Sequence, residues 1–117
     1  MRMELFKSDG FEVAEQDLGD LAVGDCVVFR TAHSTYHFWV EFPVLGIGVI
    51  SGGQVGRPTR VRLVADGVET DRLDVQTLRV GGRARVTLLG PLGEPIRCVV
   101  TSTIGSLRHL PQRSAAA

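Results

Sequence analysis

The chain has 117 residues, the length of one domain, and its 13 basic residues balance 13 acidic ones. A hydrophobic fraction of 44% is enough to build a core and excludes wholesale disorder. The 14 glycines and 5 prolines indicate many turns, which points away from a helical bundle. The 2 cysteines are too few for a disulfide framework.

The chain carries no apolar run typical of targeting or membrane insertion. Residues 1–7 do not resemble a signal peptide, and the apolar stretch 44–50 is far shorter than the ~20 residues of a membrane helix. We therefore expect a cytoplasmic protein in which Cys26 and Cys98 remain thiols. Residues 1–111 should form a single β domain, with an acidic segment over 1–22 packed on it and a disordered tail over 112–117.

Charge is unevenly distributed along the chain. Residues 1–25 hold seven acidic residues against two basic ones, whereas residues 26–117 hold eleven arginines against six acidic residues. Packing of the acidic segment over a basic sheet would explain this division. The alternative is a solvated surface on which arginine is simply the usual cation.

Strand patterns dominate from residue 25 onward. The turn at Gly24-Asp25 leads into a strand over 26–31, and we expect Asp25 to bond the amides that follow it. The next strand, 34–42, has the clearest period-two alternation and ends at Pro43. One of its faces carries Tyr36, Phe38, Val40 and Phe42, and the other carries Thr35, His37, Trp39 and Glu41.

Further strands are predicted over 45–51, 59–65, 68–70, 73–80, 83–89 and 96–104. Tight turns are expected at Asp66-Gly67 and Gly81-Gly82, and a slip in the apolar phase of 73–80 indicates a bulge. In the last strand the inward side chains are expected to be Ile96, Cys98 and Val100. Only 11–21 leaves room for a helix, and Gly19 weakens it.

Seven or eight short strands at even spacing predict an all-β fold. A small antiparallel barrel, closed or partly open, is favoured because closure removes the edge strands that an open sheet exposes. A β-sandwich is the alternative.

Residues 23–36 read V-G-D-C-V-V-F-R-T-A-H-S-T-Y. They resemble the opening of a family of small uncharacterised bacterial proteins, in which a Gly-Asp turn and a strand precede an Arg-Thr-x-Asn-Ser-x-Tyr signature. Residues 51–53, 58–59 and 100–106 fit the same family, while His33 stands where the family has asparagine. The resemblance covers most of 21–107 and implies a small β-rich fold with no established activity.

The residues that carry this resemblance include small hydroxyls at strand ends. They would form a polar pocket at one barrel mouth if they converged, together with two larger donors. The predicted pocket residues are Arg30, Thr31, Ser34, Tyr36, Ser51, Thr101 and Ser102. The alternative is that the hydroxyls close turns by bonding to the backbone.

We expect no metal, cofactor or catalytic site. His33, His37 and Glu41 are four residues apart, which on a strand separates neighbours by about 13 Å and prevents them from sharing an ion. Cys26 and Cys98 are expected to be buried and inert, and His109 has no evident partner. The chain has no nucleophile elbow, phosphate loop or dinucleotide motif, so we do not expect an enzyme.

Trp39 faces outward in the predicted strand, which favours a protein-interaction or self-assembly module. Its indole would anchor a partner protein or a second copy, as in a homodimer, while arginines steer acidic partners. The predicted contact residues are Thr35, His37, Trp39, Arg83 and Arg85.

Two alternatives to this function stay open. A single-stranded nucleic-acid-binding barrel would use a stripe of outward arginines, although the neutral charge and the scarcity of outward aromatics disfavour it. These arginines are Arg60, Arg62, Arg83 and Arg85. The second alternative is a small-ligand barrel with the polar mouth described above. A membrane is not an expected partner.

Overall fold

The computed structural model describes residues 10–66 and 76–112, whose regular structure consists of strands and short 3₁₀ helices. Eight strands form an antiparallel sheet in the order β1-β10-β3-β4-β5-β6-β8-β9, and β2 pairs with β7 in a separate ribbon. The elements are β1 (Phe11–Val13), β2 (Glu15–Asp17), η1 (Leu18–Asp20), β3 (Cys26–Arg30), β4 (Thr35–Phe42), η2 (Pro43–Leu45), β5 (Ile47–Gly52), β6 (Gly56–Asp66), β7 (Thr77–Arg79), β8 (Arg83–Leu89), β9 (Pro95–Val100) and β10 (Ser106–Leu110).

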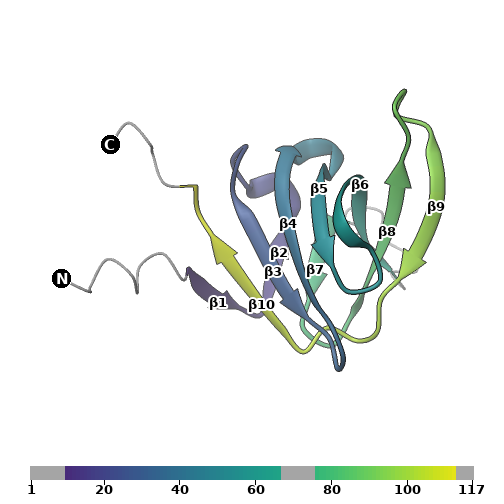
Figure 1. The fold of residues 1–117 in the computed structure, drawn as a ribbon. Coiled ribbons are helices and arrows are strands. Elements are labelled where there is room, and N and C mark those ends of the chain that lie inside the picture. The colour runs from purple at the N-terminus through teal and green to yellow at the C-terminus, as the bar shows by residue number, and fades with distance from the viewer. Residues whose placement is uncertain (1–9, 67–75, 113–117) are drawn as a thin grey trace.

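The large sheet curls, with β1 and β9 at its two edges (Figure 1). These edge strands do not pair with each other, so the sheet is open. The all-β antiparallel prediction is confirmed, and the curled sheet is compatible with a partly open barrel. Within 10–66 and 76–112, no helix is long and apolar enough to cross a membrane.

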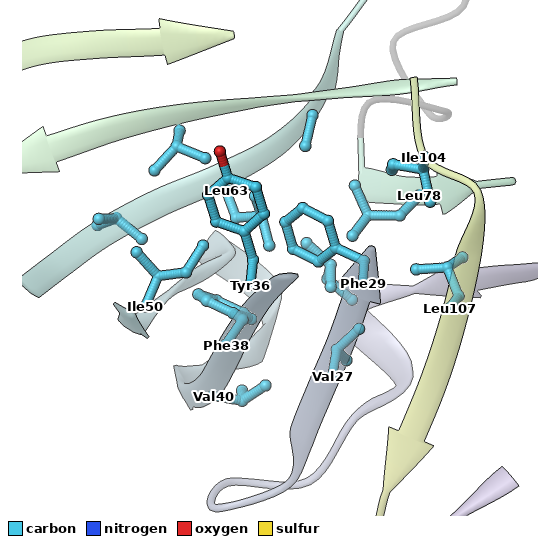
Figure 2. Packing of buried hydrophobic residues seen from close by; sticks show 14 of the residues in the cluster. Val27, Phe29, Tyr36, Phe38, Val40, Ile50, Leu63, Leu78, Ile104 and Leu107 are labelled. Carbon is cyan, nitrogen blue, oxygen red and sulfur yellow. The ribbon is translucent and has the colours of Figure 1, made fainter. Parts of the chain in front are cut away.

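The core fills the inside of the curl. Tyr36, Phe38 and Val40 on β4 point inward as the alternation predicts, and the ring of Phe29 stacks on Tyr36 with centroids 5.0 Å apart (Figure 2). Leu78 of β7 belongs to the same buried cluster, so the two-stranded ribbon packs against the inner face of the large sheet.

Gly48 on β5 allows the β4 and β5 backbones to accommodate the Phe38 ring. A Cβ atom at this position would lie 2.1 Å from the backbone oxygen of Trp39 and 3.0 Å from the ring of Phe38. No side chain fits there without moving the backbone or the ring, which accounts for the small residue in this strand.

The segment 11–21, the one place that left room for a helix, forms no α-helix. This segment forms β1, which pairs with β10, then β2, which pairs with β7, and finally the single turn η1. Pairing with distant strands satisfies its backbone, and Leu18 and Leu21 enter the core. Residues 10–22 of the acidic segment therefore join the sheet and core instead of lying across the outer face.

The single strand expected over 96–104 is wrong. Strand β9 ends at Val100, and the chain turns and returns as β10 between β1 and β3. The turn is fixed by two backbone contacts, Ile104 N–H to Gly82 O at 2.7 Å and Gly105 N–H to Arg30 O at 2.7 Å. The expected inward side chains are exposed: Val99 is buried, whereas Ile96, Cys98 and Val100 face solvent.

Smaller differences lie around β4 and β5. Phe42 was expected inward but is 53% exposed, because the register shifts between Val40 and Phe42. Residues 43–45 form η2, so β5 begins at Ile47.

The turn at Gly81-Gly82 is confirmed, with Gly82 N–H donating to Arg79 O at 3.0 Å. The expected tight turn at 66–67, the strand 68–70, the first part of 73–80 and the last five residues of the tail lie outside the described residues.

Candidate functional site

The outer face of the sheet carries side chains in three rows that run across the strands. Cross-strand pairing sets the rows, and side chains within a row are neighbours. The first row is Ser106, Arg30 and Thr35. The second row is Glu12, Arg108, Val28, His37 and Ser51. The third row is Leu110, Cys26, Trp39, Val49 and Arg60.

A groove of about 370 Å³ lies over the first two rows and reaches Leu110 at the end of the third. Its lining combines two guanidinium groups, one carboxylate, one imidazole, two hydroxyls and two aliphatic side chains. These residues are Glu12, Val28, Arg30, Thr35, His37, Ser106, Arg108 and Leu110. Such a surface offers hydrogen-bond donors for acidic groups beside the aliphatic side chains of Val28 and Leu110. This combination is suited to binding an extended segment of polypeptide.

Trp39 borders this groove through His37. The two rings are stacked, with centroids 5.9 Å apart and an interplanar angle of 18°. Trp39 faces outward as predicted and leaves 40% of its surface exposed. The predicted contact residues Thr35, His37 and Trp39 therefore do lie together on the outer face of β4.

The other two predicted contact residues, Arg83 and Arg85, are not beside Trp39. They lie on β8, and strands β5 and β6 stand between β8 and β4. Arg85 is engaged in an ion pair, since its Nη2 lies 2.6 Å from Asp66 Oδ1. The cationic groups closest to the β4 face in the first two rows are instead Arg30 and Arg108.

Two hydroxyls of the predicted polar pocket, those of Thr31 and Thr101, bond to the backbone near strand ends. Thr31 Oγ1 donates to Ser34 O at 3.5 Å across the β3–β4 hairpin. Thr101 is buried, and its Oγ1 accepts from Ala84 N–H at 3.1 Å and donates to Ser102 O at 2.8 Å. These bonds satisfy the backbone where strands end.

The remaining predicted pocket residues are dispersed. Tyr36 lies in the core, where its hydroxyl accepts from Gln54 N–H at 3.3 Å. Ser51 belongs to the second row, and Arg30 lines the groove. The structure therefore does not gather the predicted set into one pocket.

Two arginines of the expected nucleic-acid stripe are paired with carboxylates. Arg60 Nε lies 3.0 Å from Glu41 Oε1, and Arg85 pairs with Asp66. Arg62 and Arg83 are exposed on β6 and β8. This pairing reduces the charge that the stripe would present to phosphates.

His109 has a partner that the sequence did not reveal. Its Nε2 lies 3.0 Å from Asp25 Oδ2, and the same carboxylate accepts N–H bonds from Ala22 at 3.0 Å and Gln112 at 2.7 Å. Ala22 precedes Asp25, so the expected bonding to following amides is wrong. Burial alone would raise the pKa of Asp25, but the bonds from Gln112, His109 and Ala22 hold it below its ordinary value of 3.8.

The two cysteines occupy different environments. Cys26 is buried, as expected, in the third row between Leu110 and Trp39, and burial raises the pKa of its thiol to about 11. Cys98 was expected to be buried but is exposed on β9. Among the residues of 10–66 and 76–112, no cluster of three His, Cys, Asp or Glu side chains is positioned to hold a metal ion.

Five of the eight groove-lining residues were missed by sequence reasoning, among them Val28 on the predicted strand 26–31. Glu12 lies on β1, and Ser106, Arg108 and Leu110 lie on β10, two strands that were not predicted. The sequence of β10 carries no clear apolar alternation, because Leu107 shares one face with His109 and Leu110 shares the other with Arg108.

No family model matches the chain, and neither curated proteins nor solved structures give a match to it. The resemblance noted around residues 23–36 stays a prediction.

Proposed function

We propose that the chain is a non-catalytic protein-interaction module that binds its partner through the groove and the adjoining Trp39. The observation that supports this is the exposed, stacked indole beside a groove lined by both arginine and aliphatic side chains. Partly exposed tryptophan and arginine are the residue types that contribute most to binding at protein interfaces.

The groove indicates the chemistry of the partner segment. Arg30 is exposed in the groove lining, and its guanidinium group favours acidic side chains in the partner segment. The third row is apolar from Leu110 to Val49, which favours a neighbouring aliphatic or aromatic side chain in the same segment. The proposed partner is therefore an extended segment of another protein that carries acidic residues next to an apolar one.

The test is direct because Trp39 is the only tryptophan in the chain. Peptides selected from a random displayed library should be enriched in Asp or Glu beside an apolar residue, and their binding should change the fluorescence of Trp39. Trp39→Ala should weaken peptide binding about tenfold or more, measured by anisotropy of a labelled peptide. Arg30→Glu should weaken it as well and reduce its dependence on salt.

Phe42→Ala provides the matched control, since Phe42 is an exposed aromatic on β4 outside the groove lining. This variant should bind the peptide as the wild type does. Selected peptides that leave Trp39 fluorescence and the Trp39→Ala variant unaffected would overturn the proposal. An oligothymidylate that binds at low salt and dissociates steeply as salt rises would instead support the nucleic-acid alternative.

A further inference from the structure

The edge strand β9 forms a second surface that is distinct from the groove. It pairs with β8 on one side, and in Figure 1 it lies at the margin of the sheet, on the side opposite β1. Among the described residues no strand pairs with its other side. The opposite edge, β1, is only 3 residues long, whereas β9 has 6. Native sheets usually shorten, cover or charge such an edge, because its backbone groups are a template for another strand.

The hydrogen-bonding pattern shows which backbone groups face outward from β9. Thr101 N–H donates to Ala84 O at 2.9 Å, so the Thr101–Ala84 pair is a hydrogen-bonded pair of the ladder. Bonded and non-bonded pairs alternate in an antiparallel ladder, and Cys98 and Val100 fall on the non-bonded positions opposite Thr87 and Arg85. The N–H and C=O groups of Cys98 and Val100 therefore point away from β8.

The side chains along this edge are more apolar than those of a solvated strand. Ile96 is 63% exposed, Val100 is 37% exposed, and Cys98 between them is exposed as well. Arg97 carries the only charge within β9, and Pro95 lacks an N–H at its first position. Outward backbone groups and exposed apolar side chains thus occur at the same positions of one strand.

We propose that a second copy of this chain pairs with β9 edge to edge, in an antiparallel register centred on Cys98. This register places Cys98 opposite the partner's Cys98 and Ile96 opposite the partner's Val100, so that apolar side chains meet across the edge. Arg97 then faces the partner's Val99. The register centred one residue earlier would set Arg97 against the partner's Arg97, and like charges directly opposite each other are destabilising.

The dimer leaves the groove free, because β9 is four strands away from β4 in the sheet order. Pairing exchanges two N–H···O bonds between the two copies of Cys98 and directs the outward backbone groups of Val100 toward the partner strand. It also turns two eight-stranded sheets into one continuous sheet with only the short β1 edges exposed. The two-fold symmetry of such an interface closes the assembly at two chains.

Analytical ultracentrifugation of the full chain tests the proposal. The wild type should sediment as a dimer at micromolar concentration, and Val100→Pro should sediment as a monomer. This proline removes an N–H that points to the partner and leaves the bonds to β8 in place. Ile96→Lys is the second variant and should also be a monomer. Leu92→Lys is the matched control, since Leu92 is exposed in the loop before β9, and it should remain a dimer.

Disulfide formation between the two copies of Cys98 tests the register. Diamide accepts two electrons and two protons from a pair of thiols, and bonded cross-strand pairs hold Cα atoms ~5.5 Å apart, within disulfide range. Diamide should link the wild type and Cys26→Ser into dimers on a non-reducing gel and leave Cys98→Ser unlinked. A wild type that is monomeric, or a dimer that persists in folded Val100→Pro and Ile96→Lys, would overturn the proposal. So would a dimer that is lost in Trp39→Ala alone, which would place self-association on the groove side.

Discussion

The two cysteines should differ sharply in reactivity, because only the thiolate attacks alkylating reagents. Burial raises the pKa of Cys26 to about 11, so almost no thiolate is present near neutral pH, and the side chain is covered. Cys98 is exposed on β9. We expect iodoacetamide at about pH 8 to add one group to the native chain, at Cys98, and two after unfolding in urea. Intact mass and peptide mapping count and locate the adducts.

Cys98→Ser is the control for this experiment, since it removes the exposed thiol and keeps the buried one. The native variant should take up no label. Rapid labelling of Cys26 in native Cys98→Ser would show that the third row is open and that the assigned burial is incorrect.

Individual side-chain orientations were predictable where the alternation is uninterrupted. Trp39 and His37 face outward and Phe38 inward because β4 keeps its period of two from Thr35 to Val40. The same reasoning failed at Phe42, where a register shift intervenes. A bulge depends on the partner strand, so the sequence of β4 alone does not reveal it.

Strand β5 should tolerate no side chain at Gly48. Gly48→Ala would place a Cβ atom 2.1 Å from the backbone oxygen of Trp39, so β4 and β5 must separate or Phe38 must move. We expect a loss of about 1–3 kcal/mol in the free energy of unfolding, the range of overpacked core sites. Urea unfolding followed by Trp39 fluorescence measures it.

Gly82→Ala is the matched substitution, because the nearest atom to its Cβ is 3.4 Å away and Gly82 does not have a positive φ. Its unfolding free energy should stay within about 0.5 kcal/mol of the wild type. Equal losses in the two variants would mean that the Gly48 contact is not the cause.

Elements joined by short connections were predictable, and the ends of the chain were not. Strands β3, β4 and β8 match the patterns at 26–31, 34–42 and 83–89 to within a residue. The break between β9 and β10 depends on bonds from Ile104 to Gly82 and from Gly105 to Arg30, residues far away in sequence. Local patterning carries no signal for such contacts, so 96–104 was predicted as one strand.

The order of the strands in the whole sheet was not predictable from local patterning either. Composition and strand spacing predict an all-β fold, but the strand order places β10 between β1 and β3. That insertion brings Arg108 and Glu12 beside Arg30 and creates the groove. The outward orientation of Trp39 could therefore be predicted from the sequence, whereas the groove beside it follows from long-range topology.

Asp25 connects the turn before β3 to the distant segment 109–112 and should make the stability of the fold sensitive to acid. Its carboxylate accepts bonds from Ala22, His109 on β10 and Gln112. Because its pKa is lower in the folded chain than its ordinary value of 3.8, the unfolded chain binds more protons near that pH. The stabilisation is complete above the unfolded pKa and is lost as pH falls through the folded one.

We expect the melting temperature of the wild type to fall as pH is lowered from about 5 to about 2, measured by circular dichroism. Asp25→Asn should be less stable at neutral pH by about 2 kcal/mol, because it loses the charge-assisted bonds, and its melting temperature should fall less steeply over the acid range. Asp20→Asn, at an exposed aspartate in η1, should keep the wild-type slope. If the melting temperature of Asp25→Asn falls with pH as steeply as that of the wild type, other carboxylates cause the acid sensitivity.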